Sequence, residues 1–303
     1  CIRDSADGVR MGMMLAAPAG NDILFDDALC EQGRNFCSKI WNAFRLIKGW
    51  TVDDNIQAPD AAKLAVHWFE SKQNEVAAEV ADLFSKYRLS EALMAVYKLF
   101  WDEFSSWYLE MIKPAYGQGI DRTTYSATLC FLDNLLHLLH PFMPFITEEL
   151  WQQMYERNAE EGESLMVSAL SMDTYVDTAF VAQFEVVKGV ISNIRSIRLQ
   201  KNIAQKEPLD LQVLGENPVA EFNAVIQKMC NLSSITVVES KAEGASSFMV
   251  GTTEYAVPLG NMIDVEAEIA RMEAELKHKE GFLQGVLTVS YTHLRAHETP
   301  EHL

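Results

Sequence analysis

The strongest constraint on the fold is the helical spacing of apolar residues in the first half of the chain. Between positions 29 and 47 these residues lie three, four or seven positions apart: Leu29, Phe36, Ile40, Phe44 and Ile47. That spacing places them on one face of an α-helix. The same period recurs from about Asp60 to Ser85, from Ser90 (as N-cap) to Met111, and from about Asp121 to Leu139. Four such faces predict an antiparallel helical bundle.

Two prolines interrupt this period near the end of the bundle. Pro141 and Pro144 cannot continue a helix, so a break is expected there, followed by one more helix around Thr147. His137 and His140 lie three positions apart on one helical face, a spacing that can bind a metal ion. With a proline beside the second histidine, packing roles are favoured over ligation. We expect no metal site.

The second half of the chain changes character. A polar stretch around 158–164 precedes a predicted helix from Val181 to Asn202. After Pro208 the apolar period falls to two, which is typical of half-buried strands. Four short strands and one short helix predict a small α+β module with an antiparallel sheet. From Asp264 to Thr288 a heptad-like rhythm predicts the first arm of a coiled-coil hairpin or of a coiled-coil oligomer.

Composition limits the partners. The formal net charge is −18, which excludes a generic nucleic-acid coat, because neutralising phosphates needs clustered lysine and arginine. No apolar run approaches the ~20 residues of a membrane span, so no membrane partner is expected. The five cysteines form no CxxC pair, and the N-terminus shows no signal-peptide pattern. A cytoplasmic protein is expected, and any RNA contact must come from local basic faces.

Two helix faces carry such local charge. The first predicted helix presents cations and amides beside its apolar face: Arg34, Asn35, Lys39, Asn42, Arg45 and Lys48. The predicted helix 181–202 carries Arg195, Arg198 and Lys201 at i, i+3 and i+6. Both sets suit phosphate contacts, but spacing alone favours ordinary solvated faces. For Asn42, a buried amide between packed helices is an equal alternative.

Five segments, in order along the chain, resemble the C-terminal part of class I valine–tRNA ligases. They are ADGVRMGMM, PAGNDILFDD, GRNFCSKIWNAFRL, LLHPFMPFITEELW and ISNIRSIRLQKNI. The first is similar to the segment just downstream of the KMSKS catalytic loop, and a heptad helix directly after the α+β module is the valyl arrangement. The resemblance covers about Ala6 to Leu287. Isoleucyl- or leucyl-type ligases, which share the bundle, are the alternative within the same class.

The resemblance implies a mainly α fold and an order of domains. The fold expected is an antiparallel helical bundle of the class I anticodon-binding kind, then the α+β module and a coiled-coil helix. The expected parts are a connector after the catalytic domain (1–27, with 1–5 non-native), the anticodon-binding bundle (28–157), a helix plus small α+β module (165–263), the first helix of a truncated coiled-coil arm (264–287) and a non-native tail (288–303).

The resemblance also implies a function. The whole ligase attaches valine to its tRNA with ATP and Mg²⁺, and its adenylation and editing sites are expected outside this chain. The chain alone is thus expected to be inactive, with no catalytic residue, cofactor or metal. Its expected partner is the valine-accepting tRNA, contacted by Arg34, Lys39, Asn42, Arg45, Leu46, Lys48, Arg195, Arg198 and Lys201. Leu46 stands where the family has the aromatic residue of an Arg-Phe pair, which removes a stacking surface.

A rival hypothesis involves no RNA. In it the chain is a helical scaffold whose heptad helix pairs with a protein partner, in line with the acidic charge balance. Under either hypothesis we expect a monomer that can self-associate through the incomplete coiled coil.

Overall fold

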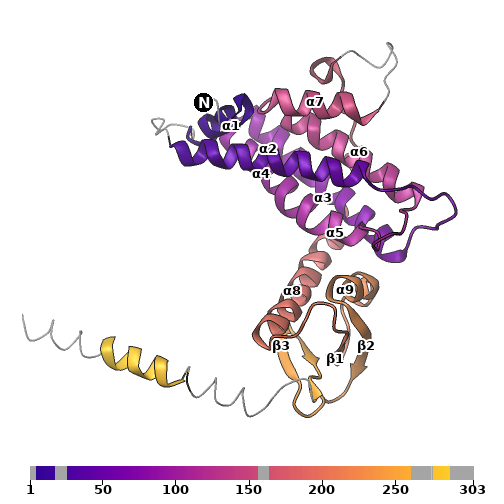
Figure 1. The fold of residues 1–303 in the computed structure, drawn as a ribbon, viewed down its shortest axis with the longest axis vertical. Coiled ribbons are helices and arrows are strands. Elements are labelled where there is room, and N and C mark those ends of the chain that lie inside the picture. The colour runs from indigo at the N-terminus through magenta and orange to yellow at the C-terminus, as the bar shows by residue number, and fades with distance from the viewer. Residues whose placement is uncertain (1–4, 18–25, 156–163, 261–273, 275, 287–303) are drawn as a thin grey trace, which may run out of the picture.

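The protein folds into a helical bundle followed by a smaller module that contains a sheet (Figure 1). The computed structural model describes residues 5–17, 26–155, 164–260, 274 and 276–286. The bundle elements are α1 Ala6–Leu15, α2 Asp27–Lys48, α3 Asp60–Ser85, α4 Leu89–Lys98, η1 Leu99–Tyr108, α5 Leu109–Ile112, α6 Arg122–Leu139 and α7 Pro144–Met154. The mainly α fold is confirmed. No helix in these described ranges is long and apolar enough to cross a membrane.

Aromatic rings form the centre of the bundle. The ring of Phe69 in α3 lies among those of Phe104, Tyr108 and Phe131, with centroids 5.2, 5.0 and 5.2 Å away. Tilted aromatic pairs attract each other at these separations. The Tyr108 hydroxyl lies 2.8 Å from Thr128 Oγ1, and burial raises the pKa of Tyr108. These aromatic residues of α3, η1 and α6 therefore form a seam in the core.

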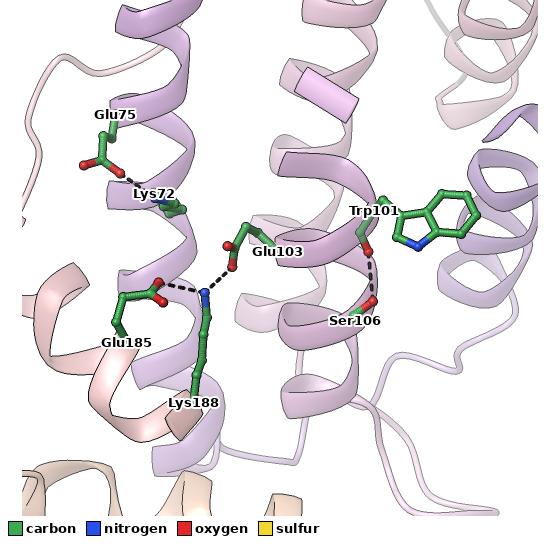
Figure 2. Close-up of polar contacts among 7 residues, drawn as sticks. All are labelled: Lys72, Glu75, Trp101, Glu103, Ser106, Glu185 and Lys188. Carbon is green, nitrogen blue, oxygen red and sulfur yellow. Dashed lines mark hydrogen bonds and ion pairs between the residues drawn. The ribbon is translucent and has the colours of Figure 1, made fainter. Parts of the chain in front are cut away.

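The middle of the third predicted helix is not a regular α-helix. The segment η1 (Leu99–Tyr108) is π-helical, a geometry that is rare and mostly confined to single turns. Ser106 Oγ donates to the carbonyl oxygen of Trp101, five residues earlier, at 2.9 Å (Figure 2). The side chain of Trp101 points toward α2, and its ring centroid lies 6.3 Å from that of Phe36. The side chain of Glu103 points in the opposite direction (Figure 2). Side chains two positions apart on a helix do not face each other, so Trp101 and Glu103 contact different neighbours.

Two helix starts in the bundle differ in how they are capped. Helix α6 begins close to the predicted position, and Asp121 caps it by accepting the backbone N–H of Thr124 at 2.8 Å. Ser90 is not an N-cap, and that prediction was wrong. Its hydroxyl lies 2.6 Å from the carbonyl oxygens of both Met14 and Ala17, just after α1. The Ser90 hydroxyl therefore takes part in a tertiary contact, which cannot be predicted from the spacing of residues in the sequence.

The two histidines near the α6–α7 turn bond within the bundle. His137 Nδ1 lies 2.9 Å from the carbonyl oxygen of Asp133, and His140 Nδ1 lies 2.8 Å from Thr147 Oγ1. The turn itself falls where the prolines predict it. In the described ranges, no three His, Cys, Asp or Glu side chains gather to hold a metal ion.

Helix α1 packs against α2 and also caps α7. A Cβ at Gly33 would lie 2.5 Å from the carbonyl oxygen of Gly8, so the two backbones can approach this closely only with glycine. The carboxylate of Asp7, itself buried, accepts the backbone N–H groups of Ile146 at 2.7 Å and Phe145 at 3.3 Å. Since α7 has no local side-chain cap, this carboxylate satisfies its first turn.

Arg10 holds the same turn from the other side. Its Nε donates to the carbonyl oxygen of Phe142 and its Nη2 to that of Pro141, both at 3.1 Å. Helix α1 is therefore a structural part of the bundle, although it lies far from α7 in sequence.

The module begins with α8 (Thr178–Gln200) and contains a four-stranded sheet. Its other elements are β1 Leu209–Leu214, η4 Ala220–Phe222, α9 Asn223–Cys230, β2 Leu232–Val238, β3 Ser246–Val250 and β4 Thr253–Val257, and η3 Leu165–Val167 precedes α8. The strand order is β2-β1-β4-β3, with β1 and β2 parallel. The predicted antiparallel sheet is therefore wrong for this pair. The connection through α9 brings the chain back to the end of the sheet at which β1 begins, as a parallel pair requires.

Lys188 joins α8 to the bundle. Its Nζ lies 2.6 Å from Glu103 Oε2 of η1 and 2.8 Å from Glu185 Oε1 (Figure 2). The same ammonium lies 5.2 Å from the Trp68 ring centroid and 5.9 Å from that of Trp107. Only 12% of the Lys188 side chain is exposed, so this cation–carboxylate pair is largely shielded from water.

The C-terminal region is helical over residues 276–286, where Leu276, Phe282, Leu283 and Val286 are exposed. The first heptad positions, at 265, 269 and 272, lie outside the described residues, as do 1–4 and 287–303. The pairing of this arm and the proposed domain limits stay predictions.

Removing the Asp7 carboxylate tests the role of α1. We expect Asp7→Ala to lower the free energy of unfolding by about 1–2 kcal/mol, because the first turn of α7 loses its cap. Urea unfolding followed by circular dichroism measures this. Asp102→Ala, at an exposed aspartate of η1, serves as control and should change it by less than about 0.5 kcal/mol. Equal effects of both changes would contradict the capping role.

Replacing Lys188 tests the link between α8 and the bundle. We expect Lys188→Met to destabilise the protein by roughly 1–3 kcal/mol, since Glu103 then keeps its shielded charge without a partner. Glu185→Gln should cost less than about 0.5 kcal/mol, because that carboxylate is 55% exposed. A Glu185→Gln loss as large as that of Lys188→Met would show that shielding from water is not what matters.

Candidate nucleic-acid interface

The outward face of α2 is the best exposed polar surface among the predicted contacts. Asp26 starts the helix by accepting the N–H of Ala28 at 2.9 Å. Phe36, Ile40, Phe44 and Ile47 are buried in the bundle, so the opposite side faces solvent. Among the residues exposed on that side are Glu31, which pairs with Arg34, and four others spaced by three or four positions: Asn35, Ser38, Asn42 and Arg45. We call these four residues the outer stripe.

Three predicted cations lie at the two edges of this face and already have partners. Lys39 Nζ lies 5.2 Å from the ring centroid of Trp101 in η1. Arg34 forms an ion pair with Glu31 at 2.9 Å, and Lys48 Nζ donates to the carbonyl oxygen of Met154 at 3.2 Å. These three side chains lie on either side of the outer stripe and do not cover it.

Asn42 and Arg45 form the C-terminal half of the stripe. Asn42 is exposed, so the buried-amide alternative does not apply to it. Leu46 is 37% exposed and lies beside them, contributing an aliphatic surface rather than a ring. An exposed guanidinium next to exposed amides can bond both phosphate oxygens and base edges.

The second predicted set, on α8, is divided by the tertiary structure. Arg195 is exposed and its guanidinium carbon lies 5.6 Å from the Trp107 ring centroid. Arg198 is only 3% exposed: its Nη1 donates to the Ala204 carbonyl at 2.9 Å and its Nη2 to that of Cys230 at 2.7 Å. Burial lowers the pKa of Arg198. Lys201 is half-buried just after the helix.

Arg198 is therefore withdrawn from the predicted phosphate contacts. Its guanidinium ties the end of α8 to α9, a structural task. The i, i+3, i+6 spacing could not reveal this, because the carbonyl groups that surround Arg198 come from segments after α8. Arg195 stays the best candidate contact on this helix.

A hollow at the C-terminal end of α2 was not anticipated from the sequence. It has a volume of about 470 Å³ and is lined by two loops, 49–51 and 113–119. The loops are joined by hydrogen bonds from Ile120 N to Thr51 O and from Asp53 N to Ile120 O, both 2.9 Å. Tyr116 in the second loop is fully exposed. We call this the end hollow. The one available signal was the turn-forming run KPAYGQG with a tyrosine at its centre.

Two further hollows lack a concentration of one charge. One, of about 420 Å³, lies between α3 and α4 and mixes lysines with glutamates, including Lys72, Lys98, Glu79 and Glu91. The other, of about 400 Å³, lies between α2 and α7 and is lined by Cys37, Ser38, Trp41, Asn42 and Ile146. The second of these hollows adjoins the outer stripe, because Ser38 and Asn42 line it, whereas the first is lined by no residue of α2.

Comparison with known proteins identifies the family. Residues 66–213, from within α3 to the middle of β1, match the family described as the anticodon-binding domain of tRNA ligase, so α2 precedes the matched range. The chain is 73% identical over 282 residues to the valine–tRNA ligase of Phocaeicola vulgatus and 70% identical over 283 residues to that of Bacteroides fragilis. Each match covers 93% of this chain and 32% of the relative.

A more distant relative gives the same result. The valine–tRNA ligase of Enterococcus faecalis is 33% identical over 288 residues, covering 89% of this chain. The chain spans about a third of the length of these curated relatives, 32% in each case. The ordered segments, the helical bundle and these identities together establish that the chain belongs to the valine–tRNA ligase family.

Proposed function

We propose that this chain is the C-terminal, tRNA-binding part of a valine–tRNA ligase, and that α2 contacts the anticodon region of the tRNA. The outer stripe of α2 carries this proposal. It presents Arg45 and Asn42 to solvent at the centre of a helix face whose edges carry further cations. Sequence-specific RNA recognition uses unstacked bases in loops, held by stacking and hydrogen bonds, with phosphate contacts for position.

The rest of the assignment follows the family. The whole ligase would attach valine to its tRNA, with ATP and Mg²⁺ serving an adenylation site that we assign to no residue of this chain. Residues 28–157 form the anticodon-binding bundle in this proposal, and 1–27 connect it to the catalytic domain. The bonds of Asp7 and Arg10 to the α6–α7 turn support a connector that transmits position to the bundle. We assign this function to the cytoplasm.

The contact must be local, because the chain as a whole repels RNA. A net charge of −18 opposes approach of a polyanion at low ionic strength. Arg45 and Lys39 on α2, with Arg195 on α8, are the cations that we assign to phosphates. A small number of phosphate contacts gives a shallow dependence of affinity on salt.

Charge reversal on α2 tests the proposed function. We expect Lys39→Glu with Arg45→Glu to weaken binding of valine-accepting tRNA roughly tenfold or more at about 50 mM salt. The slope of log affinity against log salt should fall by about 1.5, since two phosphate contacts are lost. Filter binding over a salt series measures both quantities, and circular dichroism should show an intact bundle.

The matched control reverses two cations elsewhere. Lys86→Glu with Arg88→Glu, at the α3–α4 turn, changes the net charge by the same amount. Both side chains are about half exposed, at 55% and 47%. The control should alter affinity only slightly, and equal losses in both double variants would reject α2 as the contact surface.

We also propose that the chain is a monomer when dilute and self-associates through the helix that contains residues 276–286. The exposed apolar side chains of Leu276 and Leu283, seven positions apart, support this. We expect the apparent mass to rise with concentration, and Leu276→Glu with Leu283→Glu to remove that rise. Sedimentation equilibrium measures it, with Lys277→Glu as control. Under the rival scaffold hypothesis, wild-type protein would show this association but no binding of tRNA.

A further inference from the structure

We propose that the end hollow binds one unstacked nucleobase of an RNA loop, which stacks on Tyr116 and lies against Trp50. This inference rests on the proposed function and adds a base-binding site that is separate from the outer stripe. It is carried by the hollow between loops 49–51 and 113–119, of about 470 Å³, and by the two aromatic side chains that line it.

The hollow is held open by its backbone. A parallel bridge between Val52 and Ile120 fixes the two loops side by side. A Cβ at Gly119 would lie 2.9 Å from the carbonyl oxygen of Thr51, so only glycine permits this approach. Gly117 adopts a φ of +78°, a left-handed conformation that favours glycine. A site formed in advance by the backbone avoids the entropic cost of ordering loops on binding.

The two aromatic side chains are placed so that a base can stack on them, and the ring of Tyr116 has no packing role in the bundle core. Tyr116 is fully exposed, so its ring contributes little to the stability of the bundle. Trp50 is half-buried and lines the same hollow, which gives it a fixed position. Nucleobases stack on such rings with little dependence on sequence. The glycines at 49, 117 and 119 line the hollow without side chains, which leaves room for a base.

Cations lie where the sugar–phosphate backbone of the same RNA would run. Arg45 of the outer stripe precedes Gly49, at the hollow, by four residues, or about 6 Å along the helix axis. Lys113 lines the hollow itself, although Glu110 lies 3.6 Å from its ammonium group. Lys228 Nζ of α9 donates to the Lys113 carbonyl at 3.0 Å and so anchors this loop to the module. An RNA loop held by Arg45 can therefore place a base in the hollow.

Binding of hairpin RNAs tests the site. The probe is a hairpin with the anticodon stem and loop of the valine-accepting tRNA, together with a set in which one loop nucleotide at a time is abasic. We expect Tyr116→Ala to weaken binding of the intact hairpin by about 5- to 150-fold, the equivalent of one stacked base. Tyr116→Phe, which keeps the ring, should stay within about twofold of wild type.

The abasic set identifies the stacked base. One abasic position should weaken binding by wild type about as much as Tyr116→Ala does, and should cause no further loss in that variant. Tyr175→Ala, at an exposed tyrosine in a different loop, is the control and should bind every hairpin like wild type. Because Tyr116 is exposed, circular dichroism should show unchanged folding of its variants.

The outcomes separate the two proposals. If Tyr116→Ala binds like wild type while the Lys39 and Arg45 reversals lose affinity, the base site is overturned and the proposed function stands. If the loss in Tyr116→Ala is additive with every abasic position, the tyrosine does not stack on a single base and the site is again overturned. If wild type binds no hairpin at all, the proposed function itself fails.

Discussion

The arrangement of the two parts of this protein depends on one shielded cation, the ammonium group of Lys188. It meets a carboxylate of η1 (Figure 2). It also lies over the faces of two tryptophans from different bundle elements. A lysine held this way needs all of these partners in place, because an unpaired charge away from water is costly. The ion pair with Glu103 ties α8 to the π-helical segment η1 of the bundle.

The exposed face of α2 is likewise a consequence of what surrounds it. Its apolar side is buried in the core, one edge is covered by Trp101 of η1, and the other edge contacts α7 through Lys48. What stays uncovered is a narrow polar stripe with Arg45 near its end. The end hollow continues this stripe past the last turn of the helix, where glycines replace side chains. A helix face and a loop pair joined by backbone hydrogen bonds therefore adjoin each other at the C-terminal end of α2.

Much of the bundle was predictable because helical periodicity reports burial directly. The limits of α3 agreed with the sequence, and α6 begins close to the predicted position near Asp121. The errors arose where a distant contact overrides a local preference. Serine is a residue type that often caps helices, but the Ser90 hydroxyl bonds to a carbonyl oxygen at the end of α1. The parallel pairing of β1 and β2 requires knowing that α9 crosses between them, and the alternation of apolar residues is the same in both kinds of sheet.

By itself the sequence determined the class of fold, the positions of the long helices of the bundle and the family, since these depend on local spacing and on motifs read along the chain. Only the tertiary structure decided which cations face solvent. Arg195 and Arg198 are three residues apart on one helix, yet one is exposed and the other is enclosed by carbonyl groups from later segments. The end hollow has the same origin: two loops separated by more than sixty positions meet there, joined by a bridge of backbone hydrogen bonds. Helical periodicity shows which face of a helix is apolar, but the exposure of a given polar side chain depends on what other segments pack beside it.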